Sequence, residues 1–298
     1  MTIREKPQFA KLNKITWTIT LTTSLVILGL YIWLYQYEPL PEYWNLLVLD
    51  LLSALLAIAA AITGTLLFRQ FERGEKPRLI WVWFTLGWWS WALGELAGTV
   101  YDIFKFSYGD ISVFDIFWTV GYFCFGLALF IQYRHIYGPG TKFKLTNYLL
   151  MVVLALLVTL GLTQFALRVG LGQDQSWFSV YLAIFYPVCD FFIGLAALWL
   201  SFLFGTGSWG RPWWALIVFA IADALNIFLW IGGDKLVGDN ASNLLDLISS
   251  VLYNLGYIAA IFGLLSIVLY YLTKSQTKKP DHSRLLPNEP LAPSSITD

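Results

Sequence analysis

Long apolar stretches recur along the chain, separated by short polar or turn-forming connections. A helix needs about 20 mostly apolar residues to cross a bilayer, and eight stretches reach that length. The connections contain residues that end helices, such as Glu38-Pro39-Leu40-Pro41 and Gly138-Pro139-Gly140. The pattern predicts an all-α polytopic membrane protein with eight transmembrane helices, over residues 17–36, 44–68, 79–101, 113–136, 146–166, 177–204, 212–232 and 244–272.

Lys and Arg are distributed unevenly between the two sets of connections. If the eight helices alternate in direction, 16 of the 19 basic residues fall on the side of both termini, and only Lys105, Arg168 and Lys235 fall on the other. The positive-inside rule then places both chain ends in the cytoplasm. We expect a cytoplasmic N-terminus over residues 1–16 and a disordered cytoplasmic tail over the polar residues 274–298.

The second half of the chain resembles the first half in order, polarity and loop position. Both the fourth and the eighth span contain a Gly-Tyr pair, and each is preceded by a Trp-rich span with an internal acid. The second and sixth spans also share an acid followed by apolar residues. We interpret residues 17–145 and 146–273 as two parallel four-helix repeats, related by an axis along the membrane normal. Chance similarity between apolar segments is the alternative. The matching residues are Tyr122 and Tyr257, Glu95 and Asp223, and Asp50 and Asp190.

Composition supports the membrane assignment and narrows the function. Hydrophobic residues make up 58% of the chain and charged residues 13%, whereas soluble domains average about 25% charged. The net charge of zero leaves no basic surface for nucleic acid. Two Cys and two His provide neither a disulfide framework nor a multi-histidine metal centre. No nucleotide-binding or hydrolase motif is present. We therefore expect no catalytic residues and no metal site, and the sequence identifies no cofactor.

Acidic residues inside the spans are the main candidates for function. No Lys or Arg lies well inside any span to pair with them, and a charged acid at mid-membrane costs about 2.5–3.5 kcal/mol. Asp190 and Asp223 lie near the middle of their spans, so we expect them to face the bundle interior. The other acids lie toward the outer side, which predicts an outward-facing acidic cavity. Candidate ligand-binding residues are Glu95, Asp115, Asp190, Asp223, Asn226, Asp246, Tyr253 and Trp91.

Two other interpretations of these polar residues stay open. The acids could be neutral groups that hydrogen-bond one helix to another, with Tyr, Trp or Asn as partners. They could also form a path that conducts protons or ions. Trp side chains are expected in belts at both membrane interfaces, which suits residues 17, 33, 44, 81, 177 and 213. The deeper Trp88, Trp89, Trp91, Trp118 and Trp230 could pack the core or hold an apolar ring or a quaternary amine.

One segment resembles a known family. Leu93-Gly94, Tyr101, Ser112, Asp115 and Gly121-Tyr122 are similar to a pattern in the multi-pass membrane regions that precede cyclic-di-GMP synthase and phosphodiesterase domains in bacteria. In those regions a Pro-Ser pair precedes the Asp, whereas here Gly109-Asp110-Ile111 precedes Ser112. The resemblance covers mainly residues 85–130 and implies a membrane sensor. Because no output domain follows, a sensor would need a separate partner protein on the cytoplasmic side.

These observations lead to one preferred function and two alternatives. We expect a non-enzymatic integral membrane receptor or accessory protein that binds a small or apolar ligand in an outward-facing acidic, Trp-rich cavity. A secondary transporter that uses the midplane carboxylates is the main alternative, although no span has a Pro-Gly break at its centre. A structural subunit of a larger membrane complex is the other. The lipid bilayer is the expected environment in each case, and nucleic acid is not an expected partner.

Overall fold

The computed structural model describes residues 7–104, 106, 112–137, 177–205, 207–229 and 233–277, with five separate positions between 153 and 164. The expected span at 146–166, the residues from 278 onward and Trp230 therefore lie outside the described residues. Within the described part, the regular secondary structure is helical, with no strand. The all-α expectation is confirmed for that part of the chain.

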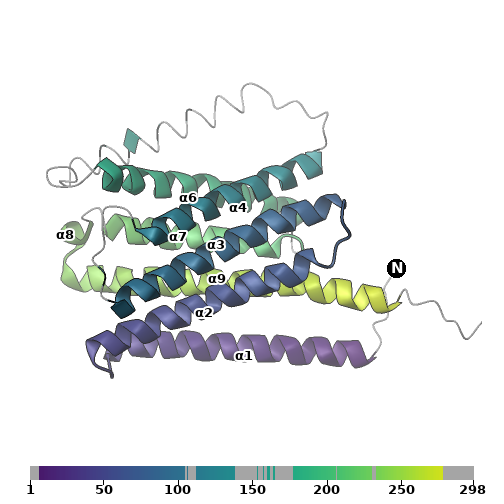
Figure 1. Ribbon diagram of the computed structural model, residues 1–298, viewed down its shortest axis with the longest axis horizontal. Helices are drawn as coiled ribbons and strands as arrows, with labels where there is room; N and C mark the ends of the chain where they lie inside the picture. The colour runs from purple at the N-terminus through teal and green to yellow at the C-terminus, as the bar shows by residue number, and fades with distance from the viewer. Residues whose placement is uncertain are drawn as a thin grey trace, which may run out of the picture.

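Seven long helices and one short helix make up the described fold (Figure 1). Six of the long helices (all except α3) are long and apolar enough to cross a membrane, which makes the chain an integral, multi-pass membrane protein. The helices are α1 (Pro7–Tyr37), α2 (Glu42–Phe68), α3 (Lys76–Phe104), α4 (Val113–Tyr137), α6 (Trp177–Phe204), α7 (Arg211–Phe228), the four-residue α8 (Asp234–Val237) and α9 (Asp239–Thr277).

Helix α3 differs from the six apolar helices in which residues make up its buried face. Its 29 residues are enough to cross a bilayer. Much of its buried face consists of Trp, Gly, Ser and Thr, which lower its hydropathy compared with an aliphatic helix. That face is covered by protein, because α3 packs between α2 and α4. Its reduced hydropathy therefore follows from its central position in the bundle.

Several helix boundaries differ from the expected spans. Helix α1 begins at Pro7, ten residues before the apolar stretch, because Pro suits the first helical turn and polar residues can extend a helix past the apolar stretch. Helix α9 likewise continues to Thr277. The α-helical part of α7 is described to Phe228, and Leu229 and Gly233 beyond it are π-helical. Hydropathy locates the helices but not where they end.

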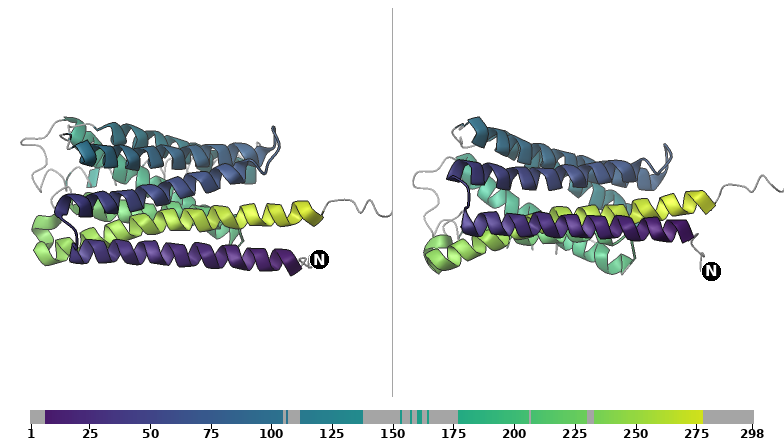
Figure 2. Two further views of the ribbon diagram at one scale, coloured as in Figure 1. Left: turned by 60° about the horizontal axis from the view of Figure 1, so that its bottom comes forward. Right: turned by 90° about the horizontal axis from the view of Figure 1, so that it is seen from below.

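The long helices run roughly along one axis; α1 to α4 alternate in direction, and so do α6, α7 and α9 (Figure 1). Helix α3 contacts α2 and α4, and α7 contacts α6 and α9. Contacts of α2 with α9 and of α4 with α6 join these two groups into a ring. Helix α1 lies outside the ring against α2 and α9. The first turns of α1 and the last turns of α9 lie at the same end of the bundle, here called the terminal end (Figure 2).

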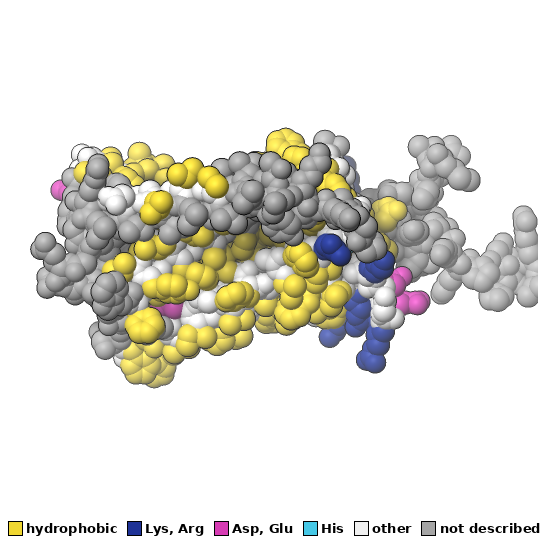
Figure 3. Space-filling view, turned by 90° about the horizontal axis from the view of Figure 1, so that it is seen from above, with side chains coloured by type: hydrophobic (Ala, Val, Ile, Leu, Met, Phe, Trp, Pro, Cys, Tyr) yellow, Lys and Arg dark blue, Asp and Glu magenta, His cyan; other side chains and the backbone are white. Residues whose placement is uncertain are grey.

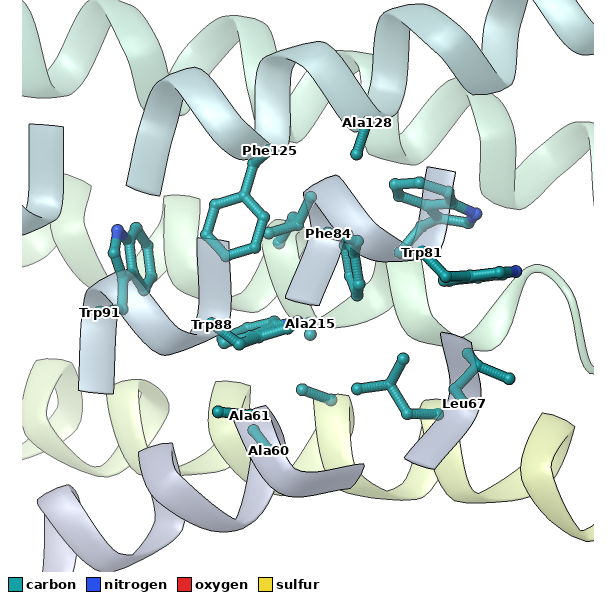
Figure 4. Close-up of a cluster of buried hydrophobic side chains, with 14 of the residues drawn as sticks. Ala60, Ala61, Leu67, Trp81, Phe84, Trp88, Trp91, Phe125, Ala128 and Ala215 are labelled. Atoms are coloured by element: carbon teal, nitrogen blue, oxygen red, sulfur yellow. The ribbon is translucent and has the colours of Figure 1, made fainter. Parts of the chain in front are cut away.

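Aromatic side chains fill the centre of the ring (Figure 4). Trp81, Trp88 and Phe84 are fully buried, and the ring of Trp81 stacks on that of Trp213 at a centroid distance of 5.9 Å. The expectation that Trp81 and Trp213 belong to an interface belt is therefore wrong. Both lie near helix starts, which suggested the interface, but neighbouring helices cover them. Each large ring buried here removes apolar surface from lipid or water and fixes the helix packing.

Apolar side chains also cover the outer faces of the helices. Leu25 and Val26 of α1 and Phe123 and Phe130 of α4 are each more than half exposed. Hydrophobic side chains spread along the bundle in the face shown in Figure 3, while Lys and Arg gather near one end. Such a surface is unfavourable in water and suits contact with a lipid bilayer.

Candidate functional site

Asp190 and Asp223 meet at the centre of the bundle. Asp190 lies near the middle of α6 and is 4% exposed, while Asp223 lies five residues before the end of α7. The Tyr122 hydroxyl of α4 lies 2.6 Å from Asp190 Oδ1 and 3.0 Å from Asp223 Oδ2. The two carboxyl groups also lie within hydrogen-bonding reach of each other. The expectation that both acids face the bundle interior is confirmed.

Glu95 of α3 is the third carboxyl of this central group. Its Oε1 accepts a hydrogen bond of 2.8 Å from the Tyr257 hydroxyl of α9, and Tyr253 is a second hydrogen-bonding neighbour. Glu95 is close enough to Asp223 for the two carboxyls to interact electrostatically. The three acids thus form one group held by tyrosines, which we call the central carboxyl cluster: Glu95, Asp190 and Asp223.

Asp115 and Asp246 have partners that fit a structural role. One oxygen of Asp115 accepts the backbone N–H of Ser112 at 2.8 Å and so caps the start of α4. The other accepts the Tyr186 hydroxyl of α6 at 2.8 Å. Asp246 of α9 accepts the Tyr35 hydroxyl of α1. These two acids join neighbouring helices through neutral donors, as the structural interpretation of the sequence predicted.

Asp50 of α2 extends the acidic group toward α1. Its carboxyl lies within hydrogen-bonding reach of Asp102 of α3 and within electrostatic reach of Glu95. Oδ2 of Asp50 is buried and has no hydrogen-bond donor. Tyr31 of α1 and Ser250 of α9 lie beside this group. Acids from α2, α3, α6 and α7 therefore lie in one continuous region of the bundle interior.

The three remaining candidates occupy different environments. Trp91 is 2% exposed and donates its indole N–H to the Trp118 carbonyl at 3.2 Å. Tyr253 stacks on Trp91 with an interplanar angle of 8° and a centroid distance of 6.3 Å. Both therefore lie beside the cluster as packed rings. Asn226 is exposed on α7, and none of the hydrogen bonds of the cluster described here involves it.

These acids lie in the half of the bundle away from the terminal end, except Asp190, which lies near the middle of α6. Asp50 is eight residues after the start of α2 and Glu95 is nine residues before the end of α3, and both of those helix ends lie opposite the terminal end. Asp223 is five residues before the end of α7 that lies on the same side. The expected placement of the acids in one half of the membrane span is therefore confirmed for these residues.

No basic residue lies in the parts of the helices that surround the cluster. Lys and Arg are absent from residues 79–104, 177–210, 212–234 and 236–273. The buried Oδ2 of Asp190 has no hydrogen-bond donor. Tyrosine hydroxyls supply one proton each, so Tyr122, Tyr253 and Tyr257 cannot satisfy every oxygen of three carboxyl groups. The tyrosines alone therefore leave carboxyl oxygens of the cluster without a donor.

Sequence reasoning named tyrosine among the expected partners of the acids, but it did not predict which tyrosine meets which acid. Tyr122 and Tyr257 were placed on the same helix faces as Asp115 and Asp246, whereas they contact Asp190, Asp223 and Glu95 on other helices. Tyr35 and Tyr186 were not singled out. Tyr186 lies one helical turn before Asp190 on the same helix, but its hydroxyl donates to Asp115 of α4, so this spacing would have indicated the wrong acid. The partners on other helices depend on how those helices pack, which no spacing within one helix shows.

No protein-family model matches this chain, and neither the curated proteins nor the solved structures contain a match to it. The geometry of the site is therefore the basis on which a function is proposed below.

Proposed function

We propose that this protein is a membrane receptor or accessory protein that binds a small monovalent cation at the central carboxyl cluster. The observation that carries the proposal is the meeting of Asp190 and Asp223 around a single Tyr122 hydroxyl, with one oxygen of Asp190 lacking any donor. Burying a carboxylate without a compensating partner is costly, so the site is most stable when a positive charge enters it.

The ligand class follows from the number and type of oxygens. Divalent cations prefer six or more oxygen ligands, with several carboxylates among them. In the described part of the chain, no three His, Cys, Asp or Glu side chains converge in a metal-binding arrangement. Two carboxyls and a tyrosine hydroxyl suit a single positive charge, such as an alkali ion, ammonium or a small protonated amine.

The structure weakens the part of the expectation that concerned an apolar ligand. Trp81, Trp88 and Trp91 pack against other rings and are almost fully buried, which is the core-packing alternative. The proposal therefore rests on the acids, and the deep Trp residues act as the rigid wall that holds the acidic helices in place.

The orientation in the membrane is part of the proposal. Exposed Arg69 and Arg73 lie in the connection between α2 and α3, and Arg134 and Arg211 lie near helix ends on the same side. Figure 3 shows Lys and Arg gathered near one end of the visible face. The positive-inside rule places this terminal end in the cytoplasm, so the acidic half would face the outside. A ligand would then arrive from the non-cytoplasmic side.

We also propose that α3 and residues 146–166 complete eight spans in two four-helix repeats. The packing supports this reading, because α3 lies between α2 and α4 much as α7 lies between α6 and α9. The contacts of α2 with α9 and of α4 with α6 then join the two halves around one axis. Each half contributes acids to the centre.

A secondary transporter is the second candidate, and one observation favours it. Helix α6 carries Pro187 in its interior, three residues before Asp190. Pro lacks a backbone N–H, so the Ala183 carbonyl one turn earlier loses its helical partner. Interrupted helices beside buried acids are a feature of transporter sites. The absence of a central Pro-Gly break therefore carries less weight against transport than the sequence suggested.

A signalling role would add a partner to this binding function. The resemblance to sensor regions of cyclic-di-GMP proteins implies output through a separate cytoplasmic protein. The connection between α2 and α3 at the terminal end would be accessible to such a partner. We assign no catalytic step to any residue.

The test is thermal unfolding of the full chain in mild detergent, at constant ionic strength, with sodium, potassium, ammonium or methylammonium chloride. Binding to the folded state alone contributes about 2.7 kcal/mol at a hundred times the dissociation constant, which corresponds to a rise in Tm of about 5 °C or more. We expect at least one cation to produce such a rise in the wild type and Asp223→Asn to reduce it.

Glu42→Gln is the matched control, because Glu42 is an exposed acid in the first turn of α2. It should keep the full cation response. A wild type that responds to no cation, or an Asp223→Asn variant that responds like the wild type, would contradict cation binding. Flux of the stabilising cation into liposomes then separates transporter from receptor.

A further inference from the structure

Basic residues end the lipid-facing stripes of several helices, and α4 shows the pattern most clearly. Phe123, Leu127 and Phe130 are exposed and follow one another at spacings of four and three residues, so they lie on one face of the helix. The exposed Arg134 follows Phe130 by four residues on the same face. This stripe therefore changes from apolar to positively charged in the last turn of α4.

The same change occurs in α1, α2, α3 and α7. In each of these helices an exposed basic residue shares a face with an exposed apolar side chain, at a spacing of three or seven residues. The pairs are Lys14 with Leu21, Arg69 with Leu66, Lys76 with Leu79, and Arg211 with Trp214. Arg69 directly follows α2 but keeps a helical backbone conformation, so it continues the face of that helix. We define the basic collar as Lys14, Arg69, Lys76, Arg134 and Arg211.

The basic collar lies at one level of the bundle. Lys14 and Arg211 begin the apolar spans of α1 and α7, and Lys76 is the first residue of α3. Arg69 directly follows the last residue of α2, and Arg134 is three residues before the end of α4. These five helix ends lie at the terminal end, and Figure 3 shows Lys and Arg beside hydrophobic side chains near one end of the visible face. Lipid-facing positions at the end of a span are at the depth of the lipid headgroups.

The bundle itself supplies few acids to the basic collar. No Asp or Glu occurs in residues 6–37, 116–173 or 191–222, so the collar residues of α1, α4 and α7 have no acid in their half of the helix. Arg78 shows a contrasting arrangement, because its guanidinium donates a hydrogen bond of 3.0 Å to a backbone carbonyl of the α2–α3 connection. The collar residues are instead exposed on the faces that meet the lipid.

We propose that the basic collar binds the headgroups of anionic phospholipids, whose acyl chains lie along the apolar stripes of the same helices. An anionic phospholipid keeps a net negative charge, whereas the phosphate of phosphatidylcholine is neutralised by its own choline. A Lys or Arg near an anionic membrane surface contributes about 1 kcal/mol, which corresponds to about a fivefold preference over a neutral lipid. The exposed Trp214 and Tyr270 suit the same headgroup layer. This inference does not depend on the proposed cation site.

The test is co-purification of lipid with the full chain. The protein is reconstituted into vesicles with equal amounts of phosphatidylglycerol and phosphatidylcholine that have the same acyl chains. It is then isolated in mild detergent, and the bound lipids are quantified by mass spectrometry. The wild type should be enriched in phosphatidylglycerol by up to about fivefold. The ratio should fall close to one in the variant that combines Lys14→Gln, Arg69→Gln, Lys76→Gln, Arg134→Gln and Arg211→Gln.

Arg134→Gln and Arg73→Gln provide a matched pair of single-charge changes. Arg134 belongs to the basic collar, whereas Arg73 is exposed in the turn between α2 and α3 and continues no apolar stripe. We expect Arg134→Gln to lower the enrichment and Arg73→Gln to keep the wild-type value. In 1 M NaCl, where charges are screened beyond about 3 Å, the wild type should lose the enrichment without any substitution. The salt comparison therefore tests the proposal even where the combined variant does not fold.

Three results would overturn the proposal. The first is equal retention of the two lipids by the wild type, which would leave the collar with a role in orientation only. The second is an enrichment that persists in 1 M NaCl. The third is an Arg73→Gln variant that loses as much enrichment as Arg134→Gln. None of these results bears on the cation response of Asp223→Asn, so this inference and the proposed function fail separately.

Discussion

A tyrosine hydroxyl carries a single proton, and this sets how many carboxyl oxygens Tyr122 can satisfy. Its oxygen is near both Asp190 and Asp223, but it can donate to only one of them at a time. Asp115, by contrast, has a donor for each oxygen, from Ser112 and Tyr186. This difference separates an acid that holds helices together from acids that have capacity left for a ligand.

Glycine positions in α4 give a direct test of the packing beside Tyr122. Gly121→Ala would push a methyl group into the Trp91 ring, and overpacking of this kind costs about 1–3 kcal/mol. Gly126→Ala in the same helix meets no atom within 4 Å and should leave stability unchanged or raise it by up to about 1 kcal/mol. Denaturant unfolding of both variants, followed by Trp fluorescence, measures the difference.

The test is the difference in stability between Gly121→Ala and Gly126→Ala. Equal stability of the two would mean that α4 does not approach α3 as closely as the structure has it. Tyr122 would then not be held beside Asp190 and Asp223, and the geometry of the site would need revision.

At the scale of the element, the sequence predicts the position and type of the long helices well and their ends poorly. Apolar length alone locates the six apolar helices, because a bilayer demands it. It does not locate the start of α1 at Pro7 or the end of α9 at Thr277, because polar residues beyond an apolar stretch can continue the helix.

Trp81 shows a related limit of helix-level reasoning. It lies five residues after the start of α3, where an interface tryptophan is expected, yet it is fully buried against Trp213 of α7. Whether a residue near a helix end faces lipid headgroups or another helix depends on the neighbours. The same reason explains why the acids could be identified from sequence while their tyrosine partners on other helices could not.

The charge distribution of the whole molecule predicts its orientation. Exposed Glu72 lies in the α2–α3 connection at the terminal end, and exposed Asn240 lies at the start of α9 at the opposite end. In right-side-out vesicles, a membrane-impermeant maleimide should label Asn240→Cys directly and Glu72→Cys only after permeabilisation. Native Cys124 is buried and Cys189 is half-buried, so background labelling should be low.

The reverse labelling pattern would place the acidic half of the bundle toward the cytoplasm. The site geometry would stand in that case, but the ligand would reach it from inside the cell. Labelling of both variants without permeabilisation would contradict a bundle whose α2–α3 connection and α9 start lie on opposite sides.

At this largest scale the central claim is that the buried carboxyls hold a positive charge that the chain itself does not supply. The most direct measurement is an experimental structure of the protein in a thallium(I) salt, with anomalous difference density calculated at the thallium edge. The account predicts a peak between the carboxyl groups of Asp190 and Asp223, within coordination distance of Tyr122. Clear density for those side chains with no peak between them, at saturating thallium, would contradict it.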